Sequence, residues 1–293
     1  MVERETEEAE LATSFLPLRK KLLRAAYRML GSIADAEDIV QETFIRWLRA
    51  DRSAVIEPEA YLRSVVMRLC LDDIGSARHR REDYVGLWLP EPVLDGAFDE
   101  IDDITLPLMV ALDRLTPLER AAFLLHDVFG LSFAEIAETI ARDPTTCRQL
   151  ASRARVHVRA ERTRFQTPRQ RGLELAEAFF AASRDGDMAK LRAMLAADVA
   201  VYADGGGKAA TITTAVVGIE AAMRLHAALA RLFDHSRSRL LHCAFINGLP
   251  GFVTVEQGST LQTTALELSG DCIATIYVTR NPDKLRHVAA SGQ

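Results

Sequence analysis

The sequence predicts a multidomain protein in which two all-α domains precede a smaller α+β domain. Its 293 residues correspond to about two average domains of roughly 150 residues, and small helical modules leave room for three. Apolar residues recur at helical spacing within 15–82 and 106–164, whereas strand-like alternation is confined to the last third. Helices followed by a run of strands favour an α+β domain with a curved antiparallel sheet.

The first predicted domain covers residues 11–82 and consists of helices. Apolar residues at helical spacing predict a helix over 15–30, which Gly31 ends. Asp35 is the expected N-cap of a second helix, because a carboxylate there accepts backbone N–H bonds and complements the helix dipole. A loop over 51–58 and a third helix over 59–73 complete the domain.

Residues 83–105 are predicted to be a linker, since they are rich in prolines and acids and have no sustained period. The second all-α domain covers 106–164 and has clear helix signals. Thr116 precedes Pro117 as an N-cap does, and Gly130 ends that helix. Ser132 is followed three residues later by Glu135, which is the spacing of a capping box.

The third predicted domain covers 169–290. Its expected helices lie at 173–183, 188–195 and 218–233, and its expected strands at 199–203, 241–246, 252–256, 263–268 and 273–278. The four cysteines lie far apart without a Cys-x-x-Cys pair, so neither a disulfide framework nor a metal site is expected. No cofactor motif is present either.

Charge is distributed unevenly along the chain, whose net charge is -5. Eight arginines and one acid lie between Thr145 and Arg171, and a second basic cluster spans 78–81. Phosphate binding is a local effect screened within about 10 Å, so these clusters are compatible with nucleic acid despite the negative total. No apolar run reaches the roughly 20 residues that span a bilayer, and the acidic N-terminus is unlike a secretory signal. We therefore expect a cytoplasmic protein without membrane contact.

The segment 131–153 has the pattern of a helix-turn-helix. Cys147, Leu150 and Ala151 would face inward, which leaves the N-terminal outer face of the second helix free to enter a major groove. Arginine to guanine and glutamine to adenine are the pairings that groove geometry favours. The expected base-reading residues are Arg148, Gln149, Ser152 and Arg153, with Arg155 and Arg159 on phosphates. The plain alternative is an arginine-rich solvated helix of an ordinary bundle.

Two segments identify a family. Residues 26–47, AYRMLGSIADAEDIVQETFIRW, closely resemble region 2 of the extracytoplasmic-function sigma factors, and 115–155, which begin LTPLERAAF, resemble their region 4. Three short motifs resemble those of the subgroup with a fused SnoaL-like domain: WLPEP at 88–92, DGGGK at 204–208 and NPDKL at 281–285. This resemblance implies a sigma factor whose third domain is a SnoaL/NTF2-like, cone-shaped half-barrel.

The resemblance also implies binding surfaces and partners, namely the clamp helices of the largest subunit of core RNA polymerase and promoter DNA. The implied polymerase-binding residues are Asp35, Asp38, Gln41, Glu42, Phe44 and Trp47. Those implied at the -10 element are Arg63, Met67, Arg68, Asp72, Arg78, Arg80 and Arg81. Arg148, Gln149, Ser152, Arg153 and Arg155 would contact the -35 element.

The three motifs are expected to form contacts between domains that tune activity. Their members are Trp88, Pro90, Glu91, Asp204, Gly205, Gly206, Gly207, Lys208, Asn281, Pro282, Asp283, Lys284 and Leu285. A plain turn at the glycines and a helix cap at Asn281 are the structural alternatives.

Two other functions stay open at this point: a ligand-sensing helix-turn-helix regulator, or a polyketide-cyclase-like enzyme. For an enzyme, His226, Tyr202 and Asp204 are conceivable acid–base groups, but no spacing makes them a constellation, so we expect no catalysis. The sequence leaves open whether a small molecule enters the pocket, and it does not identify the promoter.

Overall fold

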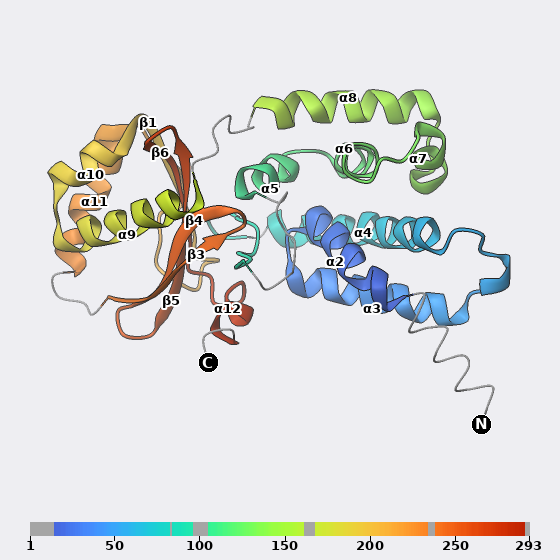
Figure 1. Ribbon diagram of the computed structural model, residues 1–293, viewed down its shortest axis with the longest axis horizontal. Helices are drawn as coiled ribbons and strands as arrows, with labels where there is room; N and C mark the ends of the chain where they lie inside the picture. The colour runs from blue at the N-terminus through green and yellow to red at the C-terminus, as the bar shows by residue number, and fades with distance from the viewer. Residues whose placement is uncertain (1–14, 83, 96–104, 161–167, 234–237, 291–293) are drawn as a thin grey trace. The chain divides into compact units, whose positions relative to one another are not determined.

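A computed structural model describes residues 15–82, 84–95, 105–160, 168–233 and 238–290 (Figure 1). The chain divides into two compact units. The first comprises residues 1–80 and 109–161, and the second comprises 81–108 and 162–293. The segment 84–95, which lies between the two helical parts in the sequence, therefore makes its contacts with the C-terminal domain.

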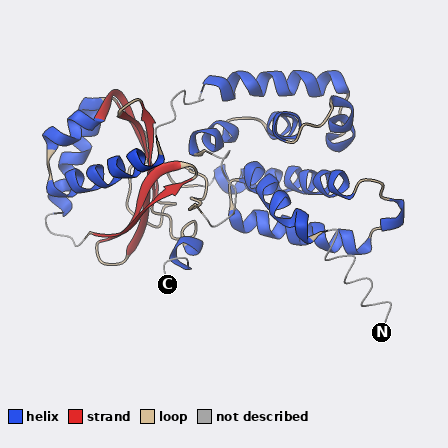
Figure 2. Cartoon of the chain, viewed as in Figure 1, coloured by secondary structure: helices blue, strands red, loops and turns tan. Residues whose placement is uncertain are grey.

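The first unit is helical throughout its described part (Figure 2). It begins with α2 (Leu16–Leu30), α3 (Ile33–Arg49), the short 3₁₀ helix η1 (Arg52–Ala54) and α4 (Pro58–Glu82). Met29, Trp47, Leu62 and Val66 are at most 2% exposed and form the centre of this bundle. Burial of such side chains stabilises each of them by roughly 1.5–3 kcal/mol, so the apolar stripes of α2, α3 and α4 hold the bundle together.

Two expectations for this part were wrong in detail. The N-cap of α3 is Ser32, whose Oγ accepts a hydrogen bond from the Asp35 backbone N–H at 3.2 Å. Ser32 has extended backbone angles, whereas Asp35 already lies in the first helical turn, where its charge complements the dipole. In addition, α4 continues to Glu82 rather than ending near Asp73, although no apolar periodicity marks its last turns.

The chain continues through α5 (Leu106–Asp113), α6 (Pro117–Phe123), the π-helical turn η2 (Leu124–Val128), α7 (Phe133–Ile140) and α8 (Pro144–Ala160). Thr116 with Glu119 and Ser132 with Glu135 form complete capping boxes, as the sequence predicts for Ser132. Between α7 and α8 the chain turns at Ala141, which has a φ of 52°. This left-handed conformation is one that glycine adopts more easily.

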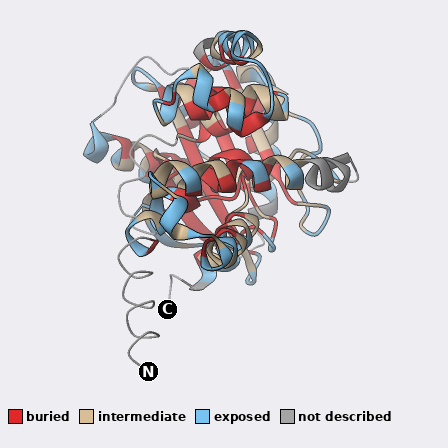
Figure 3. Cartoon of the chain, turned by 90° about the vertical axis from the view of Figure 1, so that its right-hand side faces the viewer, coloured by how far each residue is buried: buried red, intermediate tan, exposed pale blue. Residues whose placement is uncertain are grey.

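The second unit packs helices on a six-stranded sheet. Its elements are α9 (Arg169–Asp185), α10 (Met188–Met194), β1 (Leu195–Asp204), β2 (Val216–Val217), α11 (Ile219–Phe233), β3 (Arg239–Ile246), β4 (Leu249–Glu256), β5 (Thr260–Ser269), β6 (Cys272–Thr279) and α12 (Arg286–Ala290). Phe179 of α9, Leu191 of α10, Ala222 of α11 and Phe252 of β4 share one hydrophobic core. Figure 3 marks buried positions in red, among them stretches of the strands.

The strand order is β2-β1-β6-β5-β4-β3. All neighbours are antiparallel except β1 and β6, which run parallel, with Asp204 opposite Thr279. The expectation of a wholly antiparallel sheet was therefore wrong. A parallel pair needs a long crossover connection, which the chain from 205 to 271 supplies. Because the pair is parallel, β1 and β6 end at the same edge of the sheet, and the segments that follow them lie side by side.

Candidate functional site

Helix α8 presents the four residues predicted to read bases. Arg148, Gln149, Ser152 and Arg153 are all exposed, whereas Cys147 and Ala151 on the opposite side are 0% exposed. The Asp143 carboxylate accepts hydrogen bonds from the Thr146 backbone N–H at 2.9 Å and from its hydroxyl at 2.5 Å. This cap fixes the start of α8, so the exposed row lies in the first turns of the helix.

Two arginines of α8 already have partners within the protein. Arg148 lies over the ring of Phe133, with its guanidinium carbon 5.2 Å from the ring centroid. Arg155 forms an ion pair with Asp127, with Nε 2.8 Å from the carboxylate. The Arg155 guanidinium would have to share or leave this carboxylate to reach a phosphate.

Helix α4 carries the residues implied at the -10 element, and two of them contact α7 or the turn that precedes it. Arg68 donates from Nη2 to the Glu138 carbonyl at 2.9 Å and from Nε to the Thr139 carbonyl at 3.1 Å. Arg63 reaches the Phe129 carbonyl at 3.4 Å and stacks on that ring. These arginines therefore bind the carbonyls at the ends of η2 and α7.

The remaining residues implied at the -10 element are placed differently. Met67 is 0% exposed and belongs to the core of the bundle. Asp72 is exposed. The side chains of Arg78, Arg80 and Arg81 lie outside the part that the structure describes.

Helix α3 carries the residues implied for polymerase binding. Asp38 and Gln41 are exposed, Asp35, Glu42 and Phe44 are partly buried, and Trp47 is 2% exposed with its ring against Tyr61. Phe44, Val40 and Gln41 line a hollow between α3 and α2, opposite Phe15 and Leu16. Trp47 is thus a core residue in this state, and Phe44 borders a groove that is part apolar and part polar.

The second unit brings the three sequence motifs together. Asp204, at the end of β1, is 0% exposed. Its carboxylate accepts hydrogen bonds from the Tyr84 hydroxyl, from the Leu89 backbone N–H at 2.9 Å and from the Gly206 N–H at 3.0 Å. Lys284 Nζ lies 2.8 Å from the same carboxylate. This buried carboxylate therefore joins the linker to the loops that follow β1 and β6.

Lys284 is held by linker residues on several sides. Its ammonium donates to the Leu89 carbonyl and lies 4.2 Å from the Trp88 ring centroid and 4.9 Å from that of Tyr84. Cations are attracted to aromatic faces, most strongly when they are removed from water. Pro90 and Glu91 are buried beside them. WLPEP and NPDKL are thus in direct contact.

The glycines of the DGGGK motif permit close approach of a neighbouring side chain to the backbone. A Cβ on Gly206 would lie 2.2 Å from Asn281 Nδ2, and Gly206 and Gly207 both have positive φ. The Asn281 amide donates to the Tyr84 hydroxyl at 2.8 Å, while its oxygen accepts from the Asp283 N–H. At the exposed edge, Lys208 pairs with Asp283, and this pairing holds the pKa of the Asp283 carboxyl below its ordinary value. Leu285 is 1% exposed, and Asn281 is not the cap of α12.

Two further residues, Tyr84 and Asn247, help to hold the linker but lie outside the three motifs. Tyr84 precedes WLPEP, and burial, followed by its hydrogen bond to Asp204, raises the pKa of its hydroxyl. Asn247, which is 1% exposed in the turn between β3 and β4, accepts from the Val93 N–H at 2.9 Å. The Asn-Gly pair at 247–248 does indicate a hairpin turn, but nothing in the sequence links that turn to residue 93.

The three residues considered for catalysis are not brought together. Val201 and Ala203 face a cavity that His226 also lines, so their neighbours Tyr202 and Asp204 point to the other face of the sheet. Among the described residues, no cluster of His, Cys, Asp and Glu is suited to a metal ion, and no helix is long and apolar enough to cross a membrane.

Comparison with known proteins agrees with this arrangement. Residues 15–80 match the model of sigma-70 region 2, and residues 105–158 match that of sigma-70 region 4. The chain is 38% identical to the ECF RNA polymerase sigma factor SigJ of Mycobacterium tuberculosis, over 93% of this chain and 92% of that protein. It is 33% identical to the probable sigma factor SigI of the same species, over 91% and 92%.

The crystal structure of M. tuberculosis SigJ superposes on this one with a TM-score of 0.74 at 34% identity, covering 94% of this chain and 98% of that one. The expected fold class, two helical sigma domains followed by an α+β SnoaL-like domain, is thereby confirmed. The protein belongs to the extracytoplasmic-function sigma factors, which direct RNA polymerase to promoters.

Proposed function

We propose that four segments of this sigma factor have separate functions. Residues 11–82 bind core polymerase and the -10 element, 106–164 bind the -35 element, and 169–290 regulate both through the linker 83–105. The observation that carries the -35 assignment is the row of exposed polar residues at the start of α8. It is the part of a helix-turn-helix that reaches base edges.

The proposed polymerase surface is the α2–α3 groove together with the exposed residues of α3. Asp35, Asp38, Gln41 and Glu42 supply polar contacts around an apolar centre at Phe44, which is the usual composition of a protein interface. The burial of Trp47 supports a different role for that side chain: it fixes α3 on the bundle and so sets the position of the surface.

The contacts between α4 and α7 characterise a closed state that must open on promoter DNA. The -10 and -35 elements lie about 25 base pairs apart, which is roughly 85 Å of duplex at 3.4 Å per base pair. Arg68 cannot stay 2.9 Å from the Glu138 carbonyl while α4 and α8 read both elements. We infer that the arginines proposed to contact DNA are occupied by the helix-turn-helix until polymerase separates the two parts.

Regulation by the C-terminal domain is supported by the cluster around Asp204. Because this domain holds residues 84–94 of the linker, it limits how far the two DNA-binding parts can separate. A linker released from Asp204 and Lys284 would permit a different range of separations, and transcription would change with it.

A reconstituted transcription assay with core polymerase tests the proposal. The full chain should initiate at its own promoter without another factor. A truncation after Arg280 removes Asn281 and Lys284 but leaves all six strands, so it should change promoter output while the domain stays folded by circular dichroism. Unchanged output from this truncation, and from Asp204→Asn, would contradict the regulatory role. Failure of the full chain to initiate would contradict the sigma assignment itself.

A further inference from the structure

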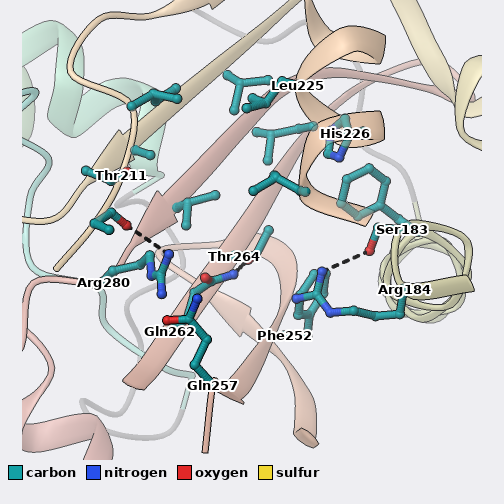
Figure 4. Close-up of a pocket in the computed structure, with 18 residues that line it drawn as sticks. Ser183, Arg184, Thr211, Leu225, His226, Phe252, Gln257, Gln262, Thr264 and Arg280 are labelled. Carbon is teal, nitrogen blue, oxygen red and sulfur yellow. Dashed lines mark hydrogen bonds between the residues drawn. The ribbon is translucent and has the colours of Figure 1, made fainter. Parts of the chain in front are cut away.

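The C-terminal domain contains a cavity of about 280 Å³ between α9, α11 and the sheet (Figure 4). This is close to the lower end of the range for small-molecule sites, roughly 300–1,000 Å³. Phe179, Leu225, Phe252 and Ile276 supply apolar walls. A cavity of this size and lining suits a compact molecule whose body is apolar.

One end of the cavity is polar and carries an excess positive charge. Arg184 and Arg280 both line it, and none of the described lining residues is acidic. Arg184 forms an ion pair with Glu256, whose charge also acts on Arg280, so two guanidinium groups share one carboxylate. The Arg280 Nη1 donates to the Ala210 carbonyl at 2.8 Å, but its buried Nε has no hydrogen-bond partner among the described residues.

Arg280 therefore still lacks a hydrogen-bond partner for its Nε–H group. A buried N–H without a partner lowers the stability of the folded domain, because its removal from water is not offset by a hydrogen bond. Gln262 and Thr264 lie beside it in the close-up, joined to each other by a hydrogen bond of 3.1 Å (Figure 4). An anionic oxygen at this end would satisfy the N–H and balance the charge.

A second unpaired group lies on α11. His226 is 7% exposed, lines the cavity, and its Nε2 is buried without a partner among the described residues. Burial lowers the pKa of His226 to about 4, so the ring is neutral near pH 7. A neutral imidazole has one donor and one acceptor nitrogen, and a hydroxyl group can pair with either.

We propose that this cavity binds a small, mainly apolar molecule that carries one carboxylate, which Arg280 binds, and a hydroxyl group, which His226 binds. The apolar body lies among Phe179, Leu225, Phe252 and Ile276. Arg280 follows β6 directly and precedes Asn281, whose amide holds Tyr84. The bound carboxylate would therefore lie one residue from the contacts that hold the linker.

Titration calorimetry on the full chain tests the site with three probes of one shape: 6-hydroxy-2-naphthoate, its neutral amide, and 2-naphthoate, which lacks the hydroxyl group. The hydroxynaphthoate should bind about tenfold more tightly than the amide, since only the carboxylate forms a charge-assisted pair with Arg280. It should also bind more tightly than 2-naphthoate.

Variants of Arg280 test whether this residue causes the preference for the carboxylate probe. Arg280→Gln should remove the preference for carboxylate over amide, and Arg280→Lys should keep most of it. Arg192→Gln is the matched control, because Arg192 is an exposed arginine paired with Glu220 outside the cavity. Equal binding of hydroxynaphthoate and amide by the unmodified protein would overturn the proposal, as would binding of none of the probes. A carboxylate preference that survives in Arg280→Gln would overturn it as well. The comparison on the unmodified protein needs no variant to fold.

Discussion

Asp204 and Lys284 form an ion pair whose side chains are 0% and 9% exposed. Removal of one partner from such a pair leaves a charge buried without compensation, which typically costs about 3–5 kcal/mol. Lys284→Met should therefore weaken the docking of residues 84–95 by an amount of that order. Hydrogen exchange of this segment is the measurement, and it should become much faster than in the unmodified protein.

Lys208→Met provides the control for that prediction. Lys208 and Asp283 form an ion pair with side chains 57% and 42% exposed, and pairs of this kind contribute only about 0–1 kcal/mol. The exchange of 84–95 should change little. Equal effects of the two substitutions would show that the buried position of Lys284 has no special role in holding the linker.

Arg148 is the residue whose replacement should reveal base reading. Arg148→Ala should cost about 1–3 kcal/mol at one base pair of the -35 element. Binding to promoters mutated singly through that element measures this loss. An equal loss on every sequence would assign Arg148 to the phosphate backbone instead.

His226 should make the stability of the C-terminal domain depend on pH. Its pKa is lowered from 6.5 to about 4, so below pH 6.5 the unfolded chain binds a proton that the folded domain does not. His226 therefore leaves the free energy of unfolding unchanged above pH 6.5. As the pH falls from 6.5 toward 4, that free energy decreases, by at most about 3 kcal/mol. His226→Leu should flatten this dependence, as measured by hydrogen exchange of β4 and β5 between pH 7 and 5. An unchanged slope in the variant would assign it to other groups.

At the scale of elements, the turn of the helix-turn-helix is strained at one position. Ala141 has a φ of 52°, a conformation that costs a residue with a Cβ roughly 1–2 kcal/mol and that glycine adopts freely. Ala141→Gly should therefore stabilise the first unit by about 1 kcal/mol, seen as a higher midpoint of thermal unfolding. Ala134→Gly, at an exposed position in the first turn of α7, is the control and should not stabilise it.

Elements with local signals could be predicted from the sequence. The helix starts at Thr116 and Ser132, and the alternation of β3 to β6, depend on residues close together in the chain. The two-residue strand β2 is too short to show a period. The parallel pairing of β1 with β6 joins residues about 75 positions apart, and no local pattern records it.

The candidate site shows the same division. The exposed row on α8 follows from helical spacing. By contrast, the burial of Met67 and Trp47 depends on which face of α3 and α4 packs inward, and apolar residues on neighbouring faces leave that ambiguous. The roles of Tyr84 and Asn247 depend on contacts over more than 100 positions. The three motifs indicated a contact surface, but the sequence did not show that they contact one another and Tyr84.

At the scale of the whole molecule, the closed contact between α4 and α7 should compete with the bound state. Ser64 and Thr139 pair through their hydroxyls at 3.1 Å beside Arg68, and neither is a proposed DNA contact. Ser64→Ala removes one partner of this hydrogen bond and leaves the Thr139 hydroxyl without it, so it should weaken the closed state by about 1 kcal/mol. Binding to core polymerase should tighten up to about fivefold. Fluorescence anisotropy with labelled protein measures this affinity.

Ser259→Ala, at an exposed turn of the C-terminal domain, is the control and should leave that affinity unchanged. Weaker binding by Ser64→Ala would mean that the α4–α7 contact assists assembly with polymerase rather than opposing it.

The long separation in sequence between Lys284 and the linker has a consequence for biosynthesis. Leu89, whose carbonyl Lys284 holds, precedes it by 195 residues, a distance that translation at about 5–20 residues per second covers in roughly 10 to 40 s. During that interval a nascent chain gains Asp204 and Asn247, which also hold residues 84–95, but not yet the lysine that pairs with Asp204. Each new molecule therefore passes through a period in which Asp204 lacks its buried partner, and the length of that period is set by the rate of translation.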